Sequence, residues 1–191
     1  DMPLQLAGGE NNAWTNNDIT NYYLTVPRQN VETGFWLESD RMLSLDFSER
    51  SLEVQRGVVI EEFKQRCLNQ PYGDIGHLLR PLAYQTHPYQ WPTIGKELSH
   101  IANATLEEVE AFFFRFYAPN NAILAVTGNI SFEEAVALTE KWFGSIPRRE
   151  VPQRNLPQEQ EQTEERRLTV ERNVPLDSLF INFIELENKI D

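Results

Sequence analysis

The sequence predicts an α+β domain in which helices are layered on a mixed or antiparallel sheet. Three observations favour this class. Two short β-rich segments flank a turn near the N-terminus, helix-periodic segments with recognisable caps follow, and a short apolar run lies between two capped helices. The predicted order is strand, strand, three helices, helix, strand, helix.

The two opening strands are predicted at residues 13–15 and 20–26, which are rich in β-branched and aromatic side chains. Residues 16–18, Asn-Asn-Asp, are turn formers. Together these segments predict a hairpin.

Three helices are predicted next, over residues 29–45, 48–68 and 75–84, because apolar side chains recur there at helical spacing. Ser48 is a suitable N-cap for the second of them. The lone cysteine, Cys67, lies at helical spacing from Phe63 and is predicted to fill core space.

Two later helices begin at Ser/Thr-x-x-Glu capping boxes, Thr105 with Glu108 and Ser131 with Glu134, and Gly144 suits the C-cap of the second. In a capping box the hydroxyl and the carboxylate each satisfy a backbone N–H that the first helical turn leaves unpaired.

Three further strands are predicted from short apolar runs, at residues 122–127, 168–171 and 178–184. Residues 149–167 are rich in Pro, Gln and Glu and bury little apolar surface, so they are predicted to be a linker. The predicted division is therefore a first part at 1–148, a linker at 149–167 and a second part at 168–191.

Composition excludes several classes of function. The formal charge of −12 arises from 29 acidic and 17 basic residues, and no basic cluster offsets it, so nucleic acid is not an expected partner. No apolar run reaches the roughly 18 residues that a spanning helix needs. Cys67 alone forms neither an internal disulfide nor a cysteine metal cluster.

The most informative local pattern is Val58-Val59-Ile60-Glu61-Glu62, in which two acids follow three β-branched residues of a predicted helix. A carboxylate that is buried must be paired, protonated or metal-bound. Helical geometry places Gln55, Glu62 and Arg66 on one face and Glu61 about 100° away. Taken alone, the pair is more simply explained as solvated surface glutamates.

Short motifs in a fixed order surround this acid pair. They are Gly8-Gly9-x-x-Asn12-Ala13-x-Thr15, Asp18-x-Thr20-x-Tyr22, Leu37-Glu38-x-Asp40-Arg41-Met42, Asn69-x-Pro71-x-Gly73, His87-Pro88-Tyr89-x-x-Pro92-x-x-Gly95 and Tyr117-x-Pro119-x-Asn121 followed by Gly128. With these motifs the chain resembles the pitrilysin/insulinase-like family of zinc metallopeptidases, also called inverzincins.

The resemblance implies a LuxS/mitochondrial-processing-peptidase-like metallohydrolase fold and assigns roles to particular residues. Glu62 matches the third zinc ligand, and Gln55 stands where the family often has an acid that supports the ligand from the same helix face. Asn12 and Ala13 match a sheet edge that pairs with the extended substrate backbone.

The same resemblance implies that this chain alone is inactive. The His-x-x-Glu-His motif, which supplies two zinc ligands and the general base, does not occur in it. None of His77, His87 and His100 forms an i, i+4 pair that replaces the motif. Zinc is therefore expected in the parent protein and not on this chain, and the general base is expected upstream of Asp1.

The resulting interpretation is a fragment of a zinc metalloendopeptidase: the first half of a catalytic domain, a linker, and the opening strands of a second half. The implied partners are an extended peptide or protein substrate and a second peptidase-like domain or subunit. Localisation is not determined by the sequence, although the family resemblance makes the bacterial periplasm a candidate. Two alternatives stay open, a non-catalytic family member that serves as a partner or peptide-binding subunit, and a plain α+β scaffold without a site.

Overall fold

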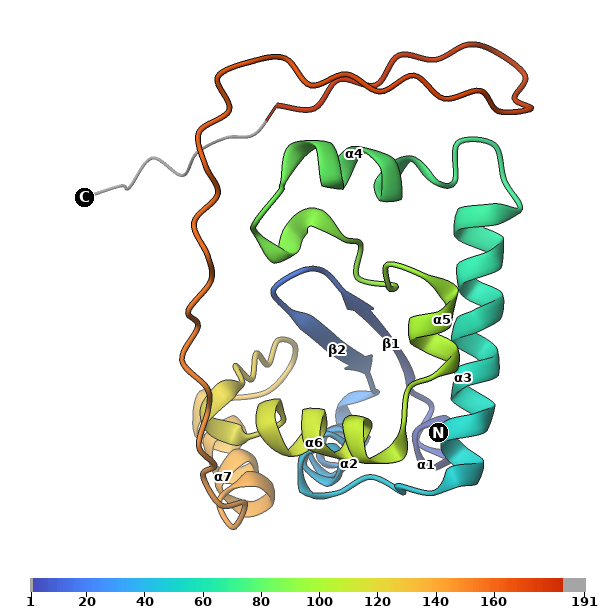
Figure 1. Ribbon diagram of the computed structural model, residues 1–191. Helices are drawn as coiled ribbons and strands as arrows, with labels where there is room; N and C mark the ends of the chain where they lie inside the picture. Colours follow the sequence, from blue (N-terminus) through green and yellow to red (C-terminus); the bar gives the residue numbers. More distant parts are fainter. Residues whose placement is uncertain (1, 184–191) are drawn as a thin grey trace. The chain divides into compact units, whose positions relative to one another are not determined.

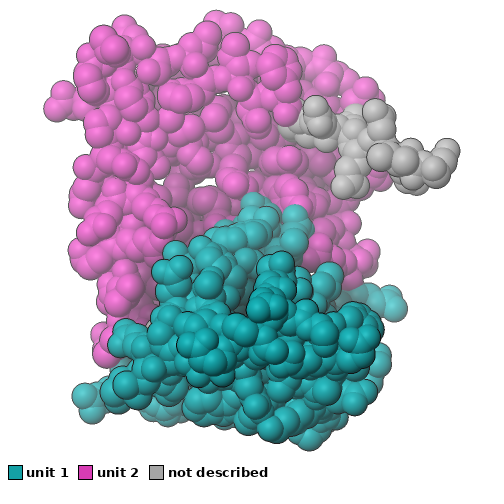
Figure 2. All heavy atoms as spheres, turned by 180° about the vertical axis from the view of Figure 1, so that it is seen from behind, with its two compact units in different colours: residues 1–52, 105–153 teal, residues 53–104, 154–191 magenta. Residues whose placement is uncertain are grey.

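The computed structural model describes residues 2–183 and has the α+β composition that the sequence predicts (Figure 1). The chain divides into two compact units, unit 1 with residues 1–52 and 105–153 and unit 2 with residues 53–104 and 154–191 (Figure 2). The elements in order are α1 (Met2–Leu6), β1 (Glu10–Thr15), β2 (Thr20–Thr25), η1 (Arg28–Asn30), α2 (Val31–Leu43), α3 (Glu49–Phe63), η2 (Lys64–Leu68), α4 (Ile75–Ala83), η3 (Pro88–Gln90), α5 (Leu98–Ala102), α6 (Leu106–Phe116), η4 (Pro119–Asn121) and α7 (Phe132–Phe143).

The sheet of unit 1 is an antiparallel hairpin of β1 and β2. Asn16 shapes its turn, because its Oδ1 accepts from the backbone N–H groups of Asp18 and Ile19, both at 2.9 Å. This is the local side-chain bonding for which Asn is favoured in turns. The predicted hairpin is confirmed, although β1 begins earlier than expected, at Glu10.

Side-chain caps fix the starts of α6 and α7. Thr105 Oγ1 accepts from the Glu108 N–H at 3.2 Å, and the Glu108 carboxylate accepts from the Thr105 N–H at 2.9 Å. Ser131 Oγ accepts from the Glu134 N–H at 3.1 Å, and Gly144 is the C-cap of α7. Both predicted N-caps and the predicted C-cap are confirmed, but only the Thr105 capping box is complete. The Glu134 carboxylate pairs with Arg28 at 2.6 Å and not with the Ser131 N–H.

Replacing Thr105 by alanine is expected to lower the free energy of unfolding of unit 1 by about 1 kcal/mol, because the Glu108 N–H loses its acceptor. Urea denaturation followed by circular dichroism measures the change. Thr163, which is exposed and outside every helix, provides the matched Thr→Ala control. An equal effect at the two positions would show that the cap contributes nothing specific.

The three predicted central helices are also present. Ser48 Oγ accepts from the Ser51 N–H at 3.2 Å at the start of α3, as expected for an N-cap. The helix predicted to continue to Leu68 changes to a π-helical turn, η2, after Phe63. The short helices α1 and α5 have five residues each, too few to produce a helical period in the sequence.

The later strand predictions are wrong over the described residues. Residues 122–127, 168–171 and 178–183 have no strand structure there, and Ile184 lies outside the described range. Ile123, in the first of these apolar runs, is 97% exposed. The physical reason is that a strand needs a neighbour to pair with, and within the described part of the chain only β1 and β2 pair.

Each unit has its own buried side chains. Phe113 in α6 is 2% exposed and Phe35 in α2 is 6% exposed, and both belong to the core of unit 1. In unit 2, Phe63 and Cys67 are buried, which confirms that Cys67 fills core space. Burial raises the pKa of the Cys67 thiol, so the neutral form is favoured.

Candidate functional site

Strand β1 carries both predicted substrate-binding residues, Asn12 and Ala13. Every residue of β1 is exposed, and among the described residues the strand pairs only with β2. One edge of β1 is therefore without a partner strand inside unit 1. An edge of this kind presents main-chain donors and acceptors to another extended chain.

The hydrogen bonding of the hairpin shows which residue faces the open edge. In an antiparallel ladder, the N–H and C=O of one residue point to the partner strand and those of the next point away. The Asn16 N–H donates to the Ile19 carbonyl at 2.9 Å, which places Asn16, and by alternation Trp14 and Asn12, on the ladder side. Ala13 therefore faces the open edge.

A side-chain bond of Asn12 agrees with this orientation. The N–H of Ala13 donates to Asn12 Oδ1 at 2.8 Å instead of to β2. The carboxamide thus satisfies a main-chain donor that otherwise has only water as a partner. A peptide that pairs with β1 replaces this local bond with one from its own backbone.

The partner strand behind Ala13 is firmly held. Tyr22 lies opposite Ala13 in the hairpin, its hydroxyl is hydrogen-bonded to that of Tyr117, and the Arg41 guanidinium lies 4.4 Å from the centre of the Tyr22 ring. Burial and the hydrogen bond with Tyr22 raise the pKa of Tyr117, so the Tyr117 hydroxyl stays protonated at neutral pH. Sequence reasoning found Tyr22, Arg41 and Tyr117 only as motif positions, because spacing gives no sign of the contact between them.

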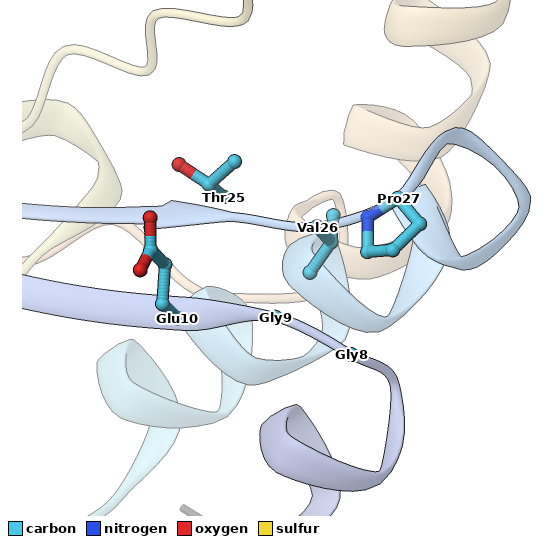
Figure 3. A pocket seen from close by; sticks show the side chains of 6 residues that line it. All are labelled: Gly8, Gly9, Glu10, Thr25, Val26 and Pro27. Atoms are coloured by element: carbon cyan, nitrogen blue, oxygen red, sulfur yellow. The ribbon is translucent and has the colours of Figure 1, made fainter.

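A hollow of 380 Å³ lies where β1 begins. Figure 3 shows the Glu10 and Thr25 side chains on the same side of the two strands. Gly9 allows the close approach beneath them, because a Cβ there would lie 2.6 Å from Leu4 Cδ1 and 2.8 Å from the Thr25 carbonyl oxygen. The hollow is open to solvent and is lined by Gly8, Gly9, Glu10, Thr25, Val26 and Pro27.

The predicted metal ligand lies in unit 2. Glu62 is half-buried on α3, and its carboxylate pairs with Arg66 one turn later at 2.9 Å. Glu61 is more exposed and pairs with Lys64 at 2.6 Å, which agrees with a solvated neighbour. Gln55 is exposed and forms no hydrogen bond with Glu62 among the described residues.

The described residues do not fit a zinc ion. Structural and catalytic zinc sites need at least three protein ligands from His, Cys, Asp or Glu. No group of three such side chains with suitable spacing occurs between residues 2 and 183. Glu62 is the single predicted ligand, and its negative charge is already balanced by Arg66.

Two of the histidines have structural partners. His77 Nε2 lies 3.0 Å from the Gly95 carbonyl oxygen, and its ring packs edge-on against Phe63 at 5.3 Å. His87 Nδ1 accepts from the Tyr89 N–H at 3.2 Å and so shapes the turn before η3.

The predicted site residues thus lie in two units: Asn12 and Ala13 on β1 of unit 1, and Gln55 and Glu62 on α3 in unit 2. The first pair forms a complete element, an open strand edge. The second pair supplies one carboxylate and no further ligand.

Comparisons with known proteins agree with this fold. Residues 103–187 match the family described as Peptidase M16 inactive domain. The zinc protease PqqE of Helicobacter pylori is 34% identical over 146 residues, which is 76% of this chain and 33% of that protein. Among solved structures, a protease from Helicobacter pylori has a TM-score of 0.74 at 32% identity and is matched over 84% of this chain and 38% of its own. The periplasmic protease PqqL from Escherichia coli has a TM-score of 0.68 at 25% identity, over 78% and 17%.

The fold is therefore of the class found in metallopeptidases. More particularly, the chain belongs to the M16 peptidase family, which confirms the resemblance to pitrilysin/insulinase-like enzymes. The chain spans about a third of the length of the curated relatives it matches. Within the described residues, no helix is both long and apolar enough to cross a bilayer.

Proposed function

We propose that this chain provides the substrate-binding strand of a zinc metalloendopeptidase. The observation that carries the proposal is the open edge of β1, where the Ala13 main chain points away from β2 and its N–H is held only by Asn12. An extended peptide that adds to this edge gains main-chain hydrogen bonds whatever its sequence, while side-chain pockets select among peptides. The substrate class is therefore an extended peptide or an unfolded protein segment.

In the same proposal Glu62 is one metal ligand of the whole protein, with Gln55 two turns earlier on the same face of α3 as a candidate supporting residue. Hydrolysis requires ligands and a general base from outside this chain, which we place upstream of Asp1, and a second peptidase-like domain or subunit as partner. Similarity to the periplasmic protease PqqL supports the bacterial periplasm as the compartment.

The isolated chain is expected to bind far less than one zinc per chain and to show no peptidase activity above background. The reason is that Glu62 lacks partner ligands and is paired with Arg66. Elemental analysis after equilibration with zinc, and cleavage of an unstructured fluorescent peptide with and without a chelator, measure the two quantities. One zinc per chain together with chelator-sensitive cleavage would refute the expectation.

Peptide binding is tested separately from catalysis. Titration of the chain with an unstructured peptide, followed by amide resonances, is expected to shift Ala13 and its strand neighbours most strongly. Shifts confined to other elements, with none on β1, would contradict the proposed role of the edge.

A second candidate, a non-catalytic family member that binds peptides as a partner subunit, is favoured by the ion pair that occupies Glu62. The sequence of the parent gene distinguishes the two candidate functions. A parent that contains His-x-x-Glu-His before Asp1 supports the peptidase, and a parent without it supports the binding subunit.

A further inference from the structure

An extended segment of unit 2 touches the rest of that unit at regularly spaced points. Residues 154–183 contain no helix or strand, and Figure 1 shows the red part of this segment running beside α4. From Arg154 to Phe183 every residue is exposed except Glu159, Arg166 and Val174. We call residues 154–174 the strap.

The first anchor of the strap is Glu159. Its Oε1 accepts from the Gln85 N–H at 2.9 Å, and its Oε2 accepts from the N–H groups of Thr86 at 2.9 Å and His87 at 2.8 Å. Three successive backbone donors therefore converge on one carboxylate. These hydrogen bonds, with Arg166 nearby, hold the pKa of Glu159 below its usual value.

The second and third anchors have the opposite charge. Arg166 donates to the carbonyls of Leu82 at 2.7 Å and Ala83 at 3.3 Å, which are among the acceptors left unpaired at the end of α4. Arg172 pairs at 2.8 Å with Asp74, the residue before α4. In the strap, the Glu159 carboxylate therefore accepts hydrogen bonds from backbone N–H groups. The Arg166 and Arg172 guanidinium groups contact carbonyl and carboxylate oxygens.

We propose that the loop Gln85–His87 is a carboxylate-binding site whose internal ligand is Glu159, and that this contact fixes the strap along α4. The chemistry of the loop defines the ligand. Three N–H groups need acceptors, and an ionised carboxylate supplies lone pairs on both oxygens without a competing donor. A carboxamide of the same shape turns an NH₂ group toward at least one of these donors.

Apolar packing does not explain the contact. The strap residues Leu168 and Val170 are 48% and 44% exposed, and Leu156 is 47% exposed. Residues 149–167 are predicted from composition to be a linker, and two of the three polar anchors, Glu159 and Arg166, give part of that segment a defined register. A single isosteric change at Glu159 is therefore sufficient to test the proposal.

In the Glu159→Gln variant, hydrogen exchange of the Gln85, Thr86 and His87 amides is expected to accelerate by about tenfold or more, because a charge-assisted acceptor is lost. Glu161→Gln is the matched control, since it makes the same charge change at an exposed position of the same strap. Amides of α6 in unit 1 provide the folding reference. Unchanged exchange at residues 85–87 in Glu159→Gln, or equal acceleration in Glu161→Gln, would overturn the proposal.

A titration provides a second readout that an unfolded variant does not mimic. In the wild-type chain, the amide protons of residues 85–87 are expected to shift together with the Glu159 carboxyl, with a common midpoint below 4.5, its usual value. Arg166 is the charged side chain that acts on Glu159, whereas His87 contacts it through its backbone N–H. The Glu161→Gln control leaves both residues in place. The contact is present above the midpoint and is lost as the pH falls through it. Separate midpoints for the amides and the carboxyl would contradict the assignment.

Discussion

Replacing Phe113 by alanine is expected to lower the free energy of unfolding of unit 1 by about 3–5 kcal/mol, the usual cost of removing a buried aromatic ring. Phe113 is 2% exposed, and its ring centre lies 5.3 Å from that of Phe47 and 5.1 Å from that of Tyr117. The Arg149 guanidinium lies 5.4 Å from the same ring. The cavity left by the substitution therefore removes contacts with three different segments of the chain.

The effect reaches the candidate site, because Tyr117 is the residue that holds Tyr22 of β2. Urea denaturation measures the loss of stability, and exchange of the β2 amides measures the loosening of the hairpin. Phe132→Ala is the control, since that ring is 79% exposed in the same unit and its removal is expected to cost less than about 1 kcal/mol. Equal losses at the two positions would mean that Phe113 is not a core residue.

The features predicted correctly from the sequence are those that depend on neighbouring residues. The caps at Ser48, Thr105 and Ser131 each join a side chain to a backbone N–H three residues away, so the spacing of residue types is sufficient to find them. The Asn16 turn is of the same kind.

The strand predicted at residues 122–127 is absent because a strand depends on a partner segment that is distant in the sequence. An apolar run records a tendency to be buried in a sheet, but it does not supply the neighbouring strand. The described residues contain no partner for this run, and Ile123 is exposed. A strand is a property of a pair of segments, whereas a capped helix is largely a property of one.

In the candidate site, too, local features could be predicted from the sequence and long-range contacts could not. Motif order predicts roles for Asn12, Ala13 and Glu62, but it does not predict the contact that holds the strand behind Ala13, which joins Tyr22 and Tyr117, 95 residues apart. The Glu159 contact joins residues 72 to 74 apart and has no motif. Sequence spacing carries no information on either contact.

Replacing Ala13 by proline is expected to weaken peptide binding at β1 while leaving the hairpin folded. Proline lacks the N–H, and the Ala13 N–H is the donor that faces the open edge. Proline is tolerated on an edge strand when its nitrogen faces away from the ladder, so the expected loss of stability is below about 1 kcal/mol. Peptide affinity is expected to fall by about tenfold or more, which corresponds to about 1.4 kcal/mol for one main-chain hydrogen bond.

Ala13→Gly is the control, because glycine keeps the N–H and removes only the methyl group, so its peptide affinity should stay close to that of the wild type. The neighbouring Trp14→Pro variant tests the orientation of the strand, since Trp14 is on the ladder side and its loss of a donor should destabilise the hairpin. Fluorescence anisotropy with a labelled unstructured peptide measures affinity, and the amide spectrum reports folding. If a folded Ala13→Pro chain binds the peptide as tightly as the wild type, the open edge of β1 is not the binding strand, and the metallopeptidase fold of this chain would then have to serve a different contact.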